Sequence, residues 1–226
     1  MGARRHLTGF TLIELLISIT ILGLLVGLAS YSFSLFSRAW DQPRSTFELA
    51  AGQMQRLYLV SRAVNDSLPW IVKDDNGRPG FYFLGREEGF TLVTSSPVYA
   101  TGAPAVIRLF REQQSSDRWR LVYEEASLAK VLLREASQVL PFERRLVVLE
   151  NLPRLSFKYF GWLSTTDRYA GSDLGAVVPP SWFSEFDGLS RIQQPQRVAL
   201  QVGDFEAVFI MPERTRILLS RATTQQ

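Results

Sequence analysis

The sequence predicts an α+β protein in which a long N-terminal helix is followed by an antiparallel β-rich domain. Apolar residues run almost without interruption from Leu15 to Ala29, and helical spacing continues to about Asp66. From Leu68 onward, short runs of alternating apolar and polar residues are separated by turn residues, as antiparallel strands require. The 226 residues leave enough chain after the helix to bury one core.

The first helical stretch has the length and composition of a membrane span. Residues 10–29 would form a helix of about 30 Å, enough to cross a hydrocarbon core. Arg4 and Arg5 precede this stretch, which places its N-terminal end in the cytoplasm and the rest of the chain across the membrane. Gly23 and Gly27 have the G-x-x-x-G spacing of a helix contact, or are two incidental small residues.

Glu14 is the unusual residue of this span. A charged side chain at the centre of a membrane helix costs about 2.5–3.5 kcal/mol, so a carboxylate near its start indicates a function. An ordinary secretory signal peptide is the alternative, since a basic start, an apolar core and a small-residue site at Gly27–Ala29 are all present. Glu14 would lie inside the apolar core of such a peptide, which argues against this alternative.

The second helical stretch is amphipathic, and Pro43 predicts a break or kink in it. A capping box at Ser45–Glu48 would restart the helix. A single apolar stripe is expected to pack on the domain, and it contains Phe47, Ala50, Ala51, Met54, Leu57, Tyr58, Ser61 and Val64.

The rest of the chain is predicted to be mostly strands. The predicted strands are residues 81–84, 90–94, 105–110, 119–123, 146–150, 155–160, 197–202 and 205–211. Residues 127–140 also fit a helix, and residues 161–195 form a long aromatic-rich loop. That loop contains four carboxylates of the type that binds calcium, without calcium-loop spacing: Asp167, Asp173, Glu185 and Asp187.

Composition excludes several kinds of chemistry. The chain has no cysteine, and its single histidine is His6 in the leader, so Cys nucleophiles, Ser-His-Asp triads and His-ligated zinc are unavailable to the domain. The net charge of +3 includes Arg4 and Arg5, which leaves +1 without them, and a nucleic-acid partner is not expected. Carboxylate pairs at residues 87–88 and 124–125 are strand neighbours on opposite faces, so neither predicts an acid/base couple.

The motif from Gly9 to Glu14, GFTLIE, resembles the processing site of type IV pilin-like proteins. This family includes pilins, type II secretion pseudopilins and competence pilins. The resemblance implies that a prepilin peptidase cleaves between Gly9 and Phe10 and that the new amine of Phe10 is methylated. It also implies that Glu14 pairs with the Phe10 amine of a neighbouring subunit in the assembled filament. No catalytic residue, cofactor or metal is implied.

Later segments are similar to the J-type minor pseudopilin of type II secretion systems. The similar segments are residues 90–95, 105–110, 119–123 and 151–160, followed by a final hairpin at 197–211. The long 161–195 segment and the break at Pro43 depart from that pattern. Glu14 argues against the K type, which usually lacks this carboxylate.

The resemblance implies a structural subunit of the tip or initiation complex of the pseudopilus, which serves protein secretion across the outer membrane. The implied partners are the prepilin peptidase, the I-type and K-type minor pseudopilins, the major pseudopilin, the inner membrane and secreted substrates. A minor pilin of a type IV pilus or DNA-uptake system is the alternative, and a membrane-anchored carboxylate enzyme is less favoured. The expected parts are a leader (1–9), a transmembrane assembly helix (10–30), an amphipathic continuation (31–66) and a periplasmic domain (67–226).

Overall fold

A single long helix, α1 (Leu12–Asn65), begins the part of the chain that the computed structural model describes. The described residues are 12–169 and 178–212, and the side chains of residues 35–50 lie outside this description. The chain divides into two units, residues 1–52 and 53–226, so α1 contributes to both.

Helix α1 continues through Pro43, where the sequence predicted a break or kink. The prediction that the helix is interrupted near Pro43 is therefore wrong. Proline removes one N–H donor and crowds the preceding turn, which disturbs a helix without necessarily ending it. The predicted boundary between residues 66 and 67 remains a proposal.

The C-terminal part of α1 packs into the second unit through a face that, among the described side chains, overlaps the predicted stripe at Leu57 and Val64 only. Val60, Ala63 and Val64 are fully buried, whereas Met54 and Tyr58 are 68% and 67% exposed. Residues 60, 63 and 64 share one face at helical spacing. The stripe was partly misplaced because α1 has apolar residues on more than one face, and only tertiary contacts select the buried one.

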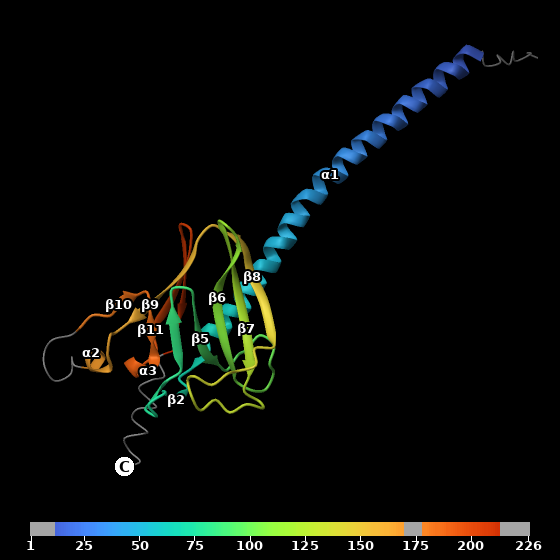
Figure 1. Ribbon diagram of the computed structural model, residues 1–226. Helices are drawn as coiled ribbons and strands as arrows, with labels where there is room; N and C mark the ends of the chain where they lie inside the picture. The colour runs from blue at the N-terminus through green and yellow to red at the C-terminus, as the bar shows by residue number, and fades with distance from the viewer. Residues whose placement is uncertain (1–11, 170–177, 213–226) are drawn as a thin grey trace, which may run out of the picture. The chain divides into compact units, whose positions relative to one another are not determined.

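The strands of the second unit pair antiparallel in three sheets (Figure 1). The large sheet has the order β11-β4-β5-β6-β7-β8, with β1 also paired to β5, the second sheet has the order β10-β9-β12-β13, and β2 pairs with β3. The bounds are β1 Ser67–Leu68, β2 Ile71–Lys73, β3 Pro79–Phe81, β4 Phe83–Arg86, β5 Gly89–Thr94, β6 Ala105–Ser115, β7 Arg118–Ser127, β8 Arg144–Leu152, β9 Leu155–Gly161, β10 Ser181–Phe183, β11 Phe186–Asp187, β12 Arg197–Val202 and β13 Phe205–Ile210. The predicted α+β class, a long apolar helix followed by antiparallel sheets, is confirmed.

Two apolar clusters lie on opposite faces of the large sheet. The main core joins the end of α1 to both larger sheets. Its buried aromatic residues are Phe83, Phe90, Tyr123, Phe157, Tyr159, Phe186 and Phe209. The second cluster consists of Val72, Tyr82, Val93, Val106, Ala126, Leu133 and Leu140. Neighbours such as Leu92 and Val93 belong to different clusters because successive strand residues point to opposite faces.

Residues 128–143 form no helix, contrary to one of the two sequence predictions for this region. This segment lies along β2, where Lys73 N donates to Arg134 O and Ala136 N donates to Lys73 O, both at 2.9 Å. Leu133 and Leu140 are buried in the second cluster. Their spacing suits a helix, but the backbone hydrogen bonds to Lys73 take the place of helical ones.

The segment predicted as a long loop contains regular elements among its described residues. They are α2 (Thr165–Tyr169), β10, β11 and α3 (Gly188–Arg191). Strand β10 extends the second sheet beside β9, and β11 extends the large sheet beside β4. The segment thus contributes a strand to each of the two larger sheets, through pairings with residues far away in the sequence.

Candidate functional site

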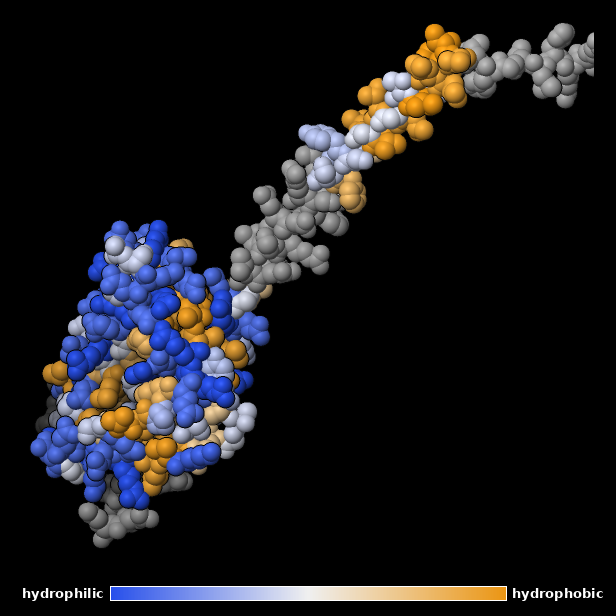
Figure 2. All heavy atoms as spheres, turned by 45° about the vertical axis from the view of Figure 1, so that its right-hand side comes forward, coloured by the Kyte–Doolittle hydropathy of each residue, from blue (hydrophilic) through white to orange (hydrophobic). Residues whose placement is uncertain are grey.

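The N-terminal part of α1 is a helix with an apolar surface. Residues Leu12–Ser34 form a 23-residue stretch of mean hydropathy 2.5, of which none is buried within the chain. At 1.5 Å per residue the stretch is about 34 Å long, so by length and composition it can cross a membrane. Figure 2 shows the hydrophobic residues along this segment. A surface of this kind needs a lipid or protein environment.

Glu14 lies in the first turn of α1 and is the only Asp, Glu, Lys, Arg or His in the sequence from Leu12 to Ser34. Gly9 and Phe10, the predicted processing residues, lie outside the described residues. The structure therefore places the carboxylate within the first described turn of the helix, and the amine predicted to meet it stays a prediction.

Two hydroxyl groups in the apolar part of this helix bond to carbonyl oxygens one turn earlier. Ser18 Oγ donates to Glu14 O and Thr20 Oγ1 donates to Leu16 O, each at 2.7 Å. Such bonds let hydroxyl groups enter an apolar medium at little cost. An added Cβ at Gly23 or Gly27 would meet no atom within 4 Å, so both glycines face open space along the helix.

The carboxylates considered for catalysis are committed to structural contacts. Glu124 pairs with Arg108 and, at 3.3 Å, with Arg145. Glu125 is 2% exposed and accepts hydrogen bonds from three backbone amides and the Tyr123 hydroxyl. The two side chains lie on opposite faces of β7, as the sequence predicted.

Glu87 and Glu88 form the other adjacent pair, at the turn between β4 and β5. Arg111 lies 3.8 Å from Glu87 and 3.3 Å from Glu88, and both carboxylates are at least half exposed. Neither carboxylate pair is arranged as two carboxyl groups that face each other across a substrate-sized gap.

The calcium candidates do not converge among the described residues. Asp187 caps α3 by accepting the Leu189 N–H at 2.9 Å. Asp173 lies outside the described residues. Within residues 12–169 and 178–212, no three Asp, Glu, His or Cys side chains are grouped as a metal site.

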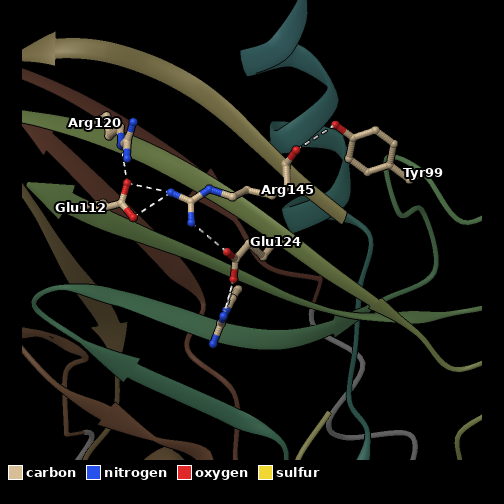
Figure 3. Close-up of polar contacts among 6 residues, drawn as sticks. Tyr99, Glu112, Arg120, Glu124 and Arg145 are labelled. Carbon is tan, nitrogen blue, oxygen red and sulfur yellow. Dashed lines mark hydrogen bonds and ion pairs between the residues drawn. The ribbon is translucent and has the colours of Figure 1, made fainter. Parts of the chain in front are cut away.

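Sequence reasoning missed an ion-pair network on the large sheet (Figure 3). Glu112 on β6 pairs with Arg120 on β7 and with Arg145 on β8, whose Nη2 lies 2.7 Å from both carboxylate oxygens. Arg145 also reaches Glu124, which joins the pairs into one network with Arg108. The hydrogen bond from Arg145 and the neighbouring Arg120 lower the pKa of Glu112 below its usual value. Only the strand register brings these residues together, so the sequence carried no signal for the network.

Comparison with known proteins identifies the N-terminal segment. Residues 4–30 match the prokaryotic N-terminal methylation motif, and no curated protein matches the chain. The chain therefore carries a type IV pilin-like prepilin signal followed by an apolar helix suited to an inner-membrane anchor. The matched segment includes Gly9, Phe10 and Glu14, and it implies processing by a prepilin peptidase and assembly with other pilin-like subunits.

Proposed function

We propose that the protein is a minor pseudopilin of a type II secretion system, most like the J-type subunit, in the tip or initiation complex of the pseudopilus. The observation that carries this proposal is Glu14, the one charged group of an apolar helix that begins within a methylation motif. The order of strands from β5 to β9 and the final β12–β13 hairpin support the J-type assignment.

In this proposal the helix first anchors the precursor in the inner membrane, with the N-terminus cytoplasmic and the β-rich domain periplasmic. Cleavage after Gly9 then frees the amine of Phe10, which is methylated. In the assembled pseudopilus, Glu14 meets the Phe10 amine of a neighbouring subunit. A lone charge in an apolar setting is strongly destabilising and a paired one is tolerated, so pairing favours transfer from membrane to filament and fixes the axial register.

The partners in this proposal are the I-type and K-type minor pseudopilins, the major pseudopilin and secreted substrates. Nucleic acid is not among them. An enzymatic role receives no support from the carboxylates at residues 87–88 and 124–125, because each is engaged in a structural contact.

A minor pilin of a type IV pilus or DNA-uptake system is the second candidate, because the methylation motif is common to all these assemblies. Deleting the gene discriminates between them. Loss of protein secretion with intact pili and DNA uptake supports the pseudopilin, and the reverse outcome supports the pilin.

Mass spectrometry of the mature N-terminus tests the processing that both candidates share. We expect a chain that begins at methylated Phe10 and a precursor that accumulates in the Gly9→Val variant. The Gly23→Val variant is the matched control and should be processed normally. A mature chain that begins at Ser30 would identify an ordinary signal peptide and refute both candidates.

A further inference from the structure

Strand β13 lies at the edge of the second sheet, where the described residues pair it with β12 alone. The register places Val202 opposite Phe205 across a two-residue turn, and Met211 N donates to Gln196 O at 2.8 Å at the far end. Odd-numbered residues of β13 therefore bond to β12. Because the direction of the backbone groups alternates along a strand, those of residues 206, 208 and 210 point away from the sheet.

The side chains of this edge are unusually apolar. Phe205, Val208 and Ile210 are 82%, 44% and 67% exposed, and Glu206 is the only charged residue of the strand. Exposed edges are normally protected by lysine, proline, a bulge or a covering segment. Strand β13 has no lysine or proline and pairs with β12 in unbroken register. An edge of this kind is suited to pairing with another strand.

Charge and shape differ between the two ends of β13. Asp204 and Glu206 make the end near the turn anionic. At the other end Arg197 lies opposite Ile210. There, a cavity of about 350 Å³ has Arg168, Arg197, Ile210 and Met211 among its lining residues. A strand that carries the same sequence in the opposite direction would place its anionic end at this cationic end.

We propose that β13 pairs antiparallel with β13 of a second copy of this chain, about a two-fold axis at Val208. In this register Val208 faces its own counterpart, and Glu206 faces Ile210 of the second copy. Each outward N–H and C=O of residues 206, 208 and 210 then has a partner, which no other antiparallel register of the two strands provides. The two second sheets become one continuous sheet across an isologous interface.

The same register explains the exposed Phe205. It places Phe205 opposite Met211 of the second copy, beside the cavity at the cationic end of that strand. Glu206 then lies in line with Arg197 of the second copy, and Ile210 of the second copy is the residue between them. The apolar surface and the opposite charges at the two ends of β13 are thus matched by one self-complementary contact.

Disulfide trapping tests this pairing directly, because the natural chain has no cysteine. The full-length Val208→Cys variant is oxidised in the membranes of the producing cells and analysed by non-reducing electrophoresis and mass spectrometry. Opposed residues of an antiparallel pair have Cα atoms about 5.5 Å apart, within the range that a disulfide spans. We expect a covalent dimer of the chain as the major species. Val139→Cys, at a 93% exposed position, is the control for random collision and should remain monomeric.

Two further variants test the register. Residues 206 of the two copies would be about 13 Å apart along the strands, too far for a disulfide, and so would residues 210. Glu206→Cys and Ile210→Cys should therefore each remain monomeric, whereas the double variant with both substitutions should dimerise. Equal cross-linking of all three single variants would overturn the proposed register.

Three other results would also overturn the proposal. Cross-linking of Val208→Cys no greater than that of Val139→Cys would show that copies do not meet at β13. A cross-link to a different protein would identify another occupant of the edge. A dimer that forms only after removal of residues 213–226 would show that this segment occupies the edge instead. The readout is a contact between copies and is independent of processing at Gly9.

Discussion

The hydroxyl of Tyr123 donates a 2.7 Å hydrogen bond to the carboxylate of Glu125, two residues further along the same face of β7. The carboxylate also accepts the backbone N–H groups of Val98, Tyr99 and Ala100 at 2.8, 3.1 and 2.6 Å. Burial, together with the adjacent carboxylate, raises the pKa of Tyr123 well above its usual value, so the tyrosine stays a neutral donor. Glu125 therefore fixes the loop that follows β5.

Substitution Glu125→Ala should strongly destabilise the domain. It removes the acceptor of the Tyr99 and Ala100 amides and of the Tyr123 hydroxyl, and it leaves the Val98 amide only its longer bond to Tyr123. A buried unsatisfied donor costs about 1–3 kcal/mol. We expect the free energy of unfolding to fall by about 2–4 kcal/mol in denaturant titrations of the full chain in detergent. Tyr123→Phe removes the hydroxyl that donates to Glu125 and accepts the Val98 N–H at 3.3 Å, but it keeps the carboxylate, so it should cost only about 1 kcal/mol. A loss below that of Tyr123→Phe would contradict the anchoring role of Glu125.

The network around Glu112 should contribute to stability in a pH-dependent way. The pKa of Glu112 is lowered from 4.5, first by the hydrogen bond from Arg145 and also by Arg120. A lowered carboxyl pKa stabilises the folded state above the unfolded value, and the contribution is lost as the pH falls through the folded value. Glu112→Gln should therefore lower the free energy of unfolding by about 0.3–1 kcal/mol at pH 7.

The difference between Glu112→Gln and the natural chain should shrink as the pH falls below 4.5 and vanish below the folded pKa of Glu112. Urea unfolding of both chains across this pH range measures it. Glu150→Gln, at an exposed position of β8, serves as the control and should have little effect at any pH. A difference that grows toward acid pH would contradict the assigned direction of the pKa.

Glu14→Ala should leave membrane insertion intact and impair assembly. Removing the charge makes the apolar helix easier to insert, but it also removes the group proposed to pair with the Phe10 amine. Membrane fractionation and the amount of the chain in sheared pseudopili measure the two effects separately. Ser18→Ala, one turn further along the helix, is the matched control, and we expect it to assemble normally. Unchanged secretion by the Glu14 variant would count against the pairing.

A shortened chain that begins at Ser45 should fold and bind its partner subunits, whereas one that begins at Asp66 should not fold. The second lacks Val60, Ala63 and Val64, which are fully buried in the main core. Burial of a valine contributes about 1.5–3 kcal/mol, so losing all three positions removes much of a typical domain's stability. Near-ultraviolet circular dichroism and cooperative unfolding report the result. If the chain that begins at Ser45 does not fold, whereas the chain with the first thirty residues does, the proposed domain boundary is wrong.

Predictions based on local pattern succeeded where local pattern governs the structure. Strands β5, β6, β7 and β12 lie within a few residues of their predicted bounds, because alternating side chains on a half-buried strand leave a period of two in the sequence. Residues 128–143 form no helix, although the spacing of their apolar residues suits one. Backbone groups of this segment form hydrogen bonds with Lys73 instead. Strands β10 and β11 were missed because each is two or three residues long and exists through a distant partner.

The sequence by itself determined the α+β class, the apolar helix and the unusual position of Glu14, because helix periodicity, hydropathy and a charge among apolar residues are local properties. Tertiary structure decided which face of α1 is buried, how Glu112, Glu124 and Arg145 meet, and that β13 lies at an edge. These features depend on strand register and sheet order, which bring together residues with no regular spacing in the chain. Glu125 is an example. In the sequence it is one of two adjacent carboxylates, Glu124 and Glu125. In the fold it accepts hydrogen bonds from the loop that follows β5 and from Tyr123.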